Sequence, residues 1–139
     1  MKKNYEHYNH AKYRLRYHII LSVKYHKRLL IPIMKDLKES LKRAEDMCSD
    51  WWIEYAETDV QNKKDHHIHL LVKAKPSASP FSIVSKIKQI TTYDMWKKHE
   101  DYLSKFFWRK HYLWTRGYFI VTIGDVSEKA IADYISNQG

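Results

Sequence analysis

Three histidines stand close together near the middle of the chain, directly before an apolar run. They belong to the stretch DHHIHLLV, residues 65–72. Because alternate side chains of a β-strand lie on the same face, His67 and His69 share one face, and the aliphatic residues between and after them share the other. Two neighbouring neutral imidazoles form half of a site for a divalent metal ion. Two solvated histidines on the open face of a sheet would give the same pattern.

A second group of chemically capable residues lies near the C-terminus, in the stretch ADYISNQG. Tyr134 and Gln138 are four residues apart, so a helix would place them on the same face, one turn apart. The glutamine oxygen could join two imidazoles around a metal ion, and the tyrosine hydroxyl could attack phosphorus. A free phenol, with a pKa of about 10, is a weak nucleophile at neutral pH, which a metal ion on the phosphate would offset. Alternatively, Tyr134 is a core aromatic residue beside Ala130 and Ile131.

Hydrophobic periodicity predicts the elements that must position these residues. Strands are expected at residues 13–25, 51–58, 66–73 and 117–123, and helices at 33–48, after Pro80, and at about 126–137. The polar stretch 97–112 has no clear assignment.

The first six elements follow a βαββαβ order, which predicts an α+β fold of the ferredoxin-like type. Such a fold is an antiparallel sheet with helices on one face, and here a C-terminal helix carrying Tyr134 is added. The aliphatic residues of the histidine strand would then contact the helices. His67 and His69 would lie on the uncovered face, and His66 would point the opposite way, outside any metal site.

Length and composition indicate one globular domain, residues 1–139. The sequence is 44% hydrophobic and has only 3 Gly and 3 Pro, which excludes a disordered or linker-rich chain. The single cysteine, Cys48, cannot form an intrachain disulfide, and the basic start lacks the apolar segment of a secretory signal. No apolar run approaches the roughly 18 residues of a membrane span. We therefore expect a cytoplasmic protein that does not enter membranes.

Positive charge is concentrated in two segments of this basic chain, whose formal net charge is +9. Residues 1–28 carry eight Lys and Arg against one Glu, and residues 86–116 carry eight against three acidic residues. Lys and Arg interleaved with Tyr and Trp are typical of surfaces that bind a phosphate backbone and stack bases, although a solubilising surface would also be basic. The predicted phosphate contacts are Lys24, Lys27, Arg28 and Lys88.

Three segments resemble, in the same order and at similar spacing, the HUH single-tyrosine transposases of single-strand insertion sequences. The segments are VKYHKRLL, DHHIHLL and LWTRGYFIVTIGDVSEKAIADYISNQ. HUH denotes histidine, a bulky hydrophobic residue and histidine, here His67-Ile68-His69. The resemblance implies that His67, His69 and Gln138 bind a divalent metal ion, Mg²⁺ or Mn²⁺. It also implies that Tyr134 cleaves one DNA strand, leaving a 5′-phosphotyrosine link and a free 3′-hydroxyl.

The resemblance further implies the partners of the protein. The substrate would be single-stranded DNA with hairpin ends, and the active unit would be a homodimer in which the tyrosine helix of one subunit acts in trans. Two other functions stay open. One is a host-adopted HUH tyrosine nuclease that acts on repeated palindromes. The other is a non-catalytic ferredoxin-like nucleic-acid-binding module, which would leave His67, His69, Tyr134 and Gln138 without a role.

Overall fold

The computed structural model describes residues 6–8, 11–13, 15–59 and 64–123. In chain order, the elements are β1 (Glu6–Tyr8), β2 (Ala11–Tyr13), β3 (Leu15–Ser22), the 3₁₀ turns η1 (Lys24–His26) and η2 (Ile31–Ile33), α1 (Met34–Asp46), β4 (Trp51–Asp59), β5 (Lys64–Ala74), α2 (Pro80–Lys98), α3 (Glu100–Phe107) and β6 (Phe119–Ile123). The expected helix at residues 126–137 lies outside the described residues. None of the helices among the described residues combines the length and the hydropathy that a membrane-spanning helix requires.

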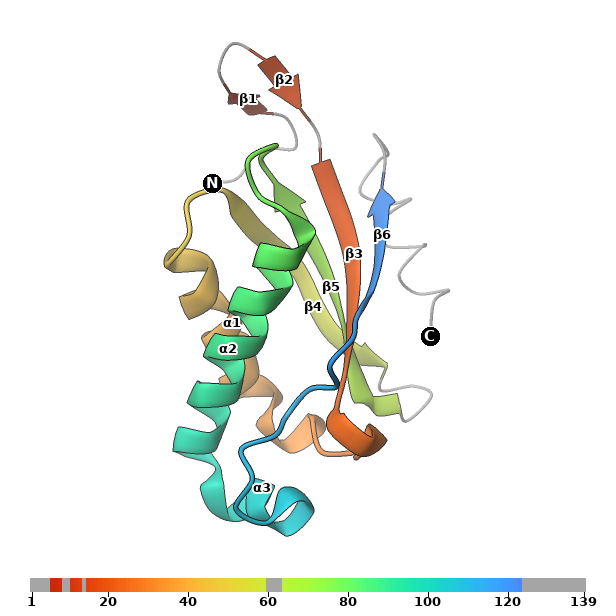
Figure 1. The fold of residues 1–139 in the computed structure, drawn as a ribbon, viewed down its shortest axis with the longest axis vertical. Helices are drawn as coiled ribbons and strands as arrows, with labels where there is room; N and C mark the ends of the chain where they lie inside the picture. Colours follow the sequence, from red (N-terminus) through yellow and green to blue (C-terminus); the bar gives the residue numbers. More distant parts are fainter. Residues whose placement is uncertain (1–5, 9–10, 14, 60–63, 124–139) are drawn as a thin grey trace.

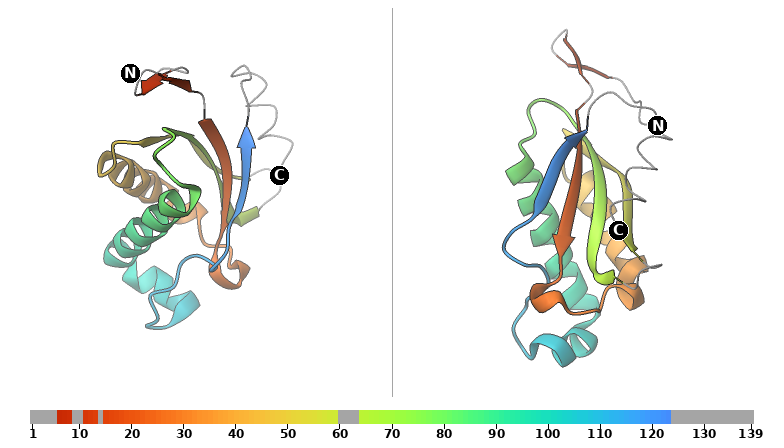
Figure 2. Two further views of the ribbon diagram at one scale, coloured as in Figure 1. Left: turned by 45° about the horizontal axis from the view of Figure 1, so that its top comes forward. Right: turned by 90° about the vertical axis from the view of Figure 1, so that its right-hand side faces the viewer.

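The four long strands form one antiparallel sheet in the order β4-β5-β3-β6. α1 and α2 lie together on one face of this sheet (Figures 1 and 2). The order β3-α1-β4-β5-α2-β6 is the βαββαβ arrangement that the sequence predicts. β1 and β2 pair separately as a short two-stranded sheet, which the sequence pattern does not predict.

Local sequence signals explain where the helices lie. Leu37, Leu41 and Ala44 recur at helical spacing and are buried, so α1 has one apolar face. α2 begins with Pro80 at its first position, and the hydroxyl of Ser79 accepts a hydrogen bond of 3.1 Å from the Ser82 amide. The apolar face of α1 determines which side of that helix contacts the sheet, and the cap at Ser79 determines where α2 begins.

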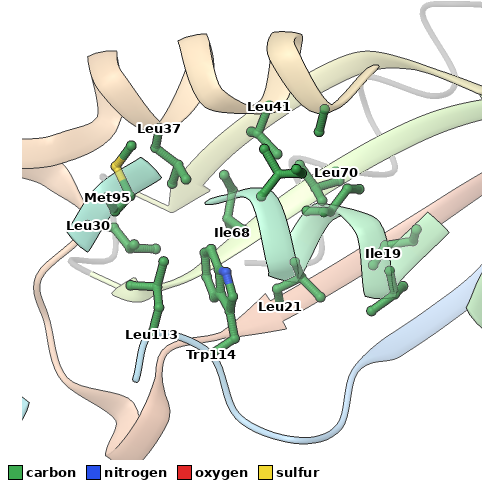
Figure 3. Packing of buried hydrophobic residues seen from close by; sticks show 14 of the residues in the cluster. Ile19, Leu21, Leu30, Leu37, Leu41, Ile68, Leu70, Met95, Leu113 and Trp114 are labelled. Carbon is green, nitrogen blue, oxygen red and sulfur yellow. The ribbon is translucent and has the colours of Figure 1, made fainter. Parts of the chain in front are cut away.

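The core lies between the helices and the sheet. Ile19 and Leu21 of β3 and Ile68 and Leu70 of β5 are essentially inaccessible to solvent, and they pack under side chains of both helices (Figure 3). Each such buried aliphatic side chain contributes about 1.5–3 kcal/mol relative to an exposed one. Burial of this face therefore fixes the register of β5, and a slip by one residue would put its histidines into the core.

A polar contact joins the two helices at their exposed side. The carboxylate of Asp94 in α2 accepts hydrogen bonds of 2.6 and 2.9 Å from the Arg43 guanidinium and of 2.7 Å from the Ser40 hydroxyl, both in α1. The pKa of Asp94 lies below its ordinary value, chiefly because of the hydrogen bond from Arg43. The ionised carboxylate thus stabilises the α1–α2 contact.

Candidate metal and DNA site

The histidine pair lies on the sheet face that α1 and α2 do not cover. Ile68, Leu70 and Val72 of β5 belong to the hydrophobic core, whereas His67 and His69 do not. The alternation expected from the sequence is therefore confirmed. The strand presents its two imidazoles together because its aliphatic residues are held in the core.

The two imidazoles point at each other. Nε2 of His67 lies 3.2 Å from Nε2 of His69, and the ring centroids are 4.9 Å apart. Nitrogen ligands that each lie about 2.1 Å from one ion are roughly 3 Å apart, so this pair has the right atoms at the right separation for a shared metal ion. Within the described residues, no group of three His, Cys, Asp or Glu side chains is arranged to hold a metal ion. The expected third ligand, Gln138, and the expected nucleophile, Tyr134, lie outside the described residues.

A third histidine, His18 of β3, contacts the pair from the neighbouring strand. Its Nε2 lies 3.0 Å from Nδ1 of His69, and the two rings stack with their centroids 5.2 Å apart. Burial lowers the pKa of His18, which favours the neutral imidazole. The sequence motifs do not single out His18, although the polar positions Arg16 and His18 alternate with apolar ones in β3.

The burial of these side chains argues against the alternative of solvated histidines on an open face. His18 is fully buried, and His69 is only 4% exposed, whereas His67 is half-buried. On the same face, Arg16 is also buried and donates a hydrogen bond of 2.7 Å to the Glu54 carboxylate of β4. A histidine this deeply buried is held in one orientation, which suits a metal ligand better than a solvated side chain.

Two further histidines extend the cluster towards the end of the sheet. The ring of His66 meets the ring of His67 edge-on at 4.8 Å, and it stacks on the ring of His26 at 5.3 Å. His66 was expected to point away from the pair, and strand alternation alone does not predict its ring contact with His67. His26 comes from η1, whose preceding residue Val23 donates its amide to the His66 carbonyl oxygen at 2.7 Å.

The predicted phosphate contacts fall into two different environments. Lys24, Lys27 and Arg28 lie in or just after η1, where Lys27 and Arg28 are exposed. The ammonium group of Lys24 lies 4.4 Å from the ring centroid of Tyr112. These residues stand beside the histidine cluster, since η1 also carries His26.

Lys88 has a structural contact that was not expected. Its ammonium group donates hydrogen bonds of 2.7, 3.0 and 2.9 Å to the carbonyl oxygens of Thr115, Arg116 and Gly117. Burial lowers the pKa of Lys88. Because an ammonium group has three N–H donors, these contacts use its full hydrogen-bonding capacity.

The block WTRGYF, residues 114–119, leads the chain into β6. The indole of Trp114 is buried and donates a hydrogen bond of 2.9 Å to the Thr91 hydroxyl of α2. The amide of Thr115 donates to the Ser22 carbonyl oxygen at 2.8 Å. The block therefore ties the end of β3 to α2 and places β6 at the edge of the sheet.

Comparison with known proteins agrees with this arrangement. Residues 11–138 match the family described as "Transposase IS200 like". The chain is 27% identical over 129 residues to the transposase for insertion sequence element IS200 of Salmonella typhimurium, an alignment that covers 93% of this chain and 80% of that protein. It is 28% identical over 127 residues to the ISDra2 transposase TnpA of Deinococcus radiodurans, covering 91% and 85%.

Two solved structures share the fold. A crystal structure of a Deinococcus radiodurans R1 protein, solved at 1.90 Å, superposes with a TM-score of 0.71 at 24% identity, covering 99% of this chain and 98% of that one. A REP-associated tyrosine transposase bound to a REP hairpin gives a TM-score of 0.59 at 11% identity, covering 86% and 61%. With the family match over residues 11–138, the conclusion is that this chain belongs to the IS200-like transposases, the single-tyrosine HUH type.

Proposed function

We propose that this protein is a metal-dependent DNA transposase that cuts and rejoins single strands at the ends of an insertion sequence. The observation that carries this proposal is the convergence of the Nε2 atoms of His67 and His69, 3.2 Å apart, on the face away from the helices. Membership of the IS200-like transposases supports the reaction class. In this proposal His67, His69 and Gln138 hold a divalent metal ion, Mg²⁺ or Mn²⁺.

Cleavage is a transesterification. The Tyr134 hydroxyl loses its proton, and its oxygen attacks the scissile phosphorus. The bond from phosphorus to the 3′-oxygen breaks, and that oxygen takes up a proton as a free 3′-hydroxyl. A bound divalent ion polarises the phosphate and stabilises the departing oxygen.

Rejoining reverses the same step. A 3′-hydroxyl attacks the 5′-phosphotyrosine and releases the Tyr134 hydroxyl, so the bond energy is conserved without nucleotide hydrolysis. His18 contacts His69 at 3.0 Å and fixes the plane of its ring. A ligand held in this way needs little reordering when the metal ion binds.

The proposed substrate is single-stranded DNA with hairpin ends. The relative described as bound to a REP hairpin supports the substrate class. Lys24, Lys27 and Arg28 would contact phosphates beside the site. We further propose a homodimer in which the Tyr134 helix of one subunit completes the metal site of the other.

A second candidate function is a host-adopted nuclease that acts on repeated palindromes. The shared fold with a REP-associated tyrosine transposase is the observation that favours it. Its chemistry would be the same, and gene neighbourhood separates the two: subterminal palindromes flanking a compact element support a mobile transposase. A non-catalytic binding module is disfavoured, because it would not require the two histidines to converge.

The direct test is covalent trapping. Purified protein is incubated with Mg²⁺ and end-labelled single-stranded oligonucleotides from the flanks of its gene, and the products are separated on a denaturing gel. We expect a labelled protein–DNA adduct that disappears with EDTA and with the His67→Ala variant. A folded protein that binds these oligonucleotides but forms no adduct under any divalent ion would refute the catalytic proposal.

A further inference from the structure

Two strained turns meet at the end of the molecule next to the histidine cluster. Among the described residues, Tyr25, His26 and Trp108 are the non-glycine residues with positive φ, at 60°, 53° and 58°. For side chains of this size such a backbone costs about 1–3 kcal/mol each and is typical of functional surfaces. In Figures 1 and 2 the turn after β3 and the end of α3 lie close together, below the sheet.

Aromatic contacts hold these two turns together. The ring of Tyr25 lies 6.4 Å from the rings of both Phe107 and Tyr112, and those two rings are 6.1 Å apart. Despite these contacts Tyr25 is 65% exposed, and Trp108 beside Phe107 is 84% exposed. Large aromatic side chains this exposed leave flat apolar faces in water, where a planar ligand would cover them.

Cations surround the exposed rings. Lys27 and Arg28 follow Tyr25, and Arg109 and Lys110 follow Trp108; all four side chains are exposed. Within the described part of the chain, none of these four cations has a carboxylate partner. Glu100 and Asp101 lie in the first turn of α3, the end opposite Trp108. Rings interleaved with available positive charge fit a polyanion with flat bases better than an apolar protein surface.

The surface continues into the candidate site. η1 directs Tyr25 towards Phe107, while its neighbour His26 stacks on His66, whose ring touches that of His67. One short turn therefore links the aromatic surface to a candidate metal ligand. If a phosphate of a DNA strand lies at His67, the adjacent nucleotides of that DNA strand would contact the rings of the aromatic surface.

We propose that Tyr25, Trp108 and the four cations around them form a stacking surface for the single-stranded DNA next to the scissile phosphate. Bases stack on the two exposed rings, while Lys27, Arg28, Arg109 and Lys110 contact phosphates. The substrate in this inference comes from the proposed function. The new element is the place where the protein holds the DNA strand that flanks the scissile phosphate.

The test measures binding without cleavage. Fluorescence anisotropy with a labelled single-stranded oligonucleotide, in EDTA, compares wild-type protein with Trp108→Ala and with Phe81→Ala. Phe81 is also exposed, at 71%, but it lies in the first turn of α2, at the opposite end of that helix from α3. Trp108→Ala should raise Kd about ten-fold, within the range that loss of one stacked base gives, and Phe81→Ala should leave it unchanged.

Two further comparisons separate stacking from unfolding and from simple charge. Trp108→Phe should recover most of the affinity, because it keeps a ring, and duplex DNA of equal length should bind wild type and Trp108→Ala equally. The double variant Lys27→Ala/Arg28→Ala should bind DNA with a weaker salt dependence. The slope of the logarithm of the association constant against the logarithm of the salt concentration should decrease in magnitude by about 0.7 for each phosphate that the protein no longer neutralises.

Several outcomes would overturn the stacking surface. Within the single-stranded DNA assay, these are an unchanged Kd for Trp108→Ala, an equal loss of affinity for Phe81→Ala, or no recovery of affinity by Trp108→Phe. Two other ligands, duplex DNA and vesicles of anionic lipid, are measured in the same way. If Trp108→Ala loses as much affinity for either of them as for single-stranded DNA, the surface does not stack bases. Because the assay contains no metal ion, it does not depend on catalysis. Covalent trapping separately decides the proposed function, so either idea can fail while the other stands.

Discussion

The imidazole of His18 lies against that of His69, with 3.0 Å between Nε2 of His18 and Nδ1 of His69. The other nitrogen of His69, Nε2, faces His67. If Nε2 binds the metal ion, the proton of the neutral ring must be on Nδ1, and the Nδ1–H group donates a hydrogen bond to a neighbour. Neutral His18 is placed to accept this hydrogen bond, and burial favours its neutral form. The three histidines thus form a line in which His18 sets the tautomer of a proposed ligand.

His18→Phe should weaken metal binding while keeping a flat, buried ring. The substitution removes the acceptor for His69 Nδ1, and removal of such an outer hydrogen-bond partner reduces metal affinity about 10–100-fold. Calorimetric titration with Mn²⁺ measures the effect. His18→Gln offers an amide oxygen instead and should retain more affinity than His18→Phe. Equal affinities for wild type and His18→Phe would show that His18 does not orient the ligand.

His67→Ala and His69→Ala should differ in stability although both abolish metal-dependent cleavage. Half-buried His67 leaves little space behind when truncated, so its removal should lower the free energy of unfolding by less than about 1 kcal/mol. Buried His69 leaves a cavity and no longer bonds to His18, so we expect a decrease of about 2 kcal/mol. Urea denaturation without metal measures both values, and equal decreases would contradict the burial difference.

Asp94→Asn should lower stability at neutral pH by about 1 kcal/mol, because it weakens the charged contact with the half-exposed Arg43. The folded-state pKa of Asp94 lies below its ordinary value of 3.8. Its contribution is therefore present above 3.8 and is lost as the pH falls through the lower, folded pKa. Urea denaturation between pH 7 and pH 2 should show the difference from wild type shrinking in acid. Asp101→Asn, which changes an exposed side chain of α3, is the control. A stability difference between Asp94→Asn and wild type that grows in acid would contradict a lowered pKa for Asp94.

Mixing two inactive variants should restore cleavage if the tyrosine acts in trans. In a mixed dimer of Tyr134→Phe and His67→Ala subunits, one site carries both defects and the other carries neither. The adduct should therefore reappear on mixing, to at most about half the wild-type level, since one site per mixed dimer is intact. If subunit exchange is shown independently and no adduct forms, each tyrosine serves its own chain.

The sequence predicted the sheet and its two covering helices because their periodicity is strong. The sequence pattern does not indicate α3, because that helix has only 8 residues, two turns in which a helical period can repeat, and it begins almost directly after the long α2. The first predicted strand ran to residue 25, whereas β3 ends at Ser22 and the chain turns at Tyr25 with a positive φ. Nothing in a β-rich run of residues indicates that turn.

In the site too, local sequence patterns predict some features, whereas contacts between residues far apart in the sequence are not predicted. Alternation alone predicts that His67 and His69 share a face. The contact with His18 depends on the antiparallel register of β3 and β5, in which His18 pairs with Leu71. The contact of Lys88 with the carbonyl oxygens of residues 115–117 likewise spans 27 to 29 residues of sequence. Such contacts follow from the packed fold, which local patterns do not determine.

The proposed reaction requires Tyr134 to become covalently attached to DNA at a site formed with His67 and His69. The most direct measurement is mass spectrometry of the trapped adduct after digestion of both the protein and the DNA. We expect one modified peptide, with a 5′-phosphate of the cleaved strand on the Tyr134 oxygen, and no adduct from Tyr134→Phe protein that still binds DNA. Attachment to another residue, attachment through a 3′-phosphate, or wild-type adduct formation by Tyr134→Phe would contradict it.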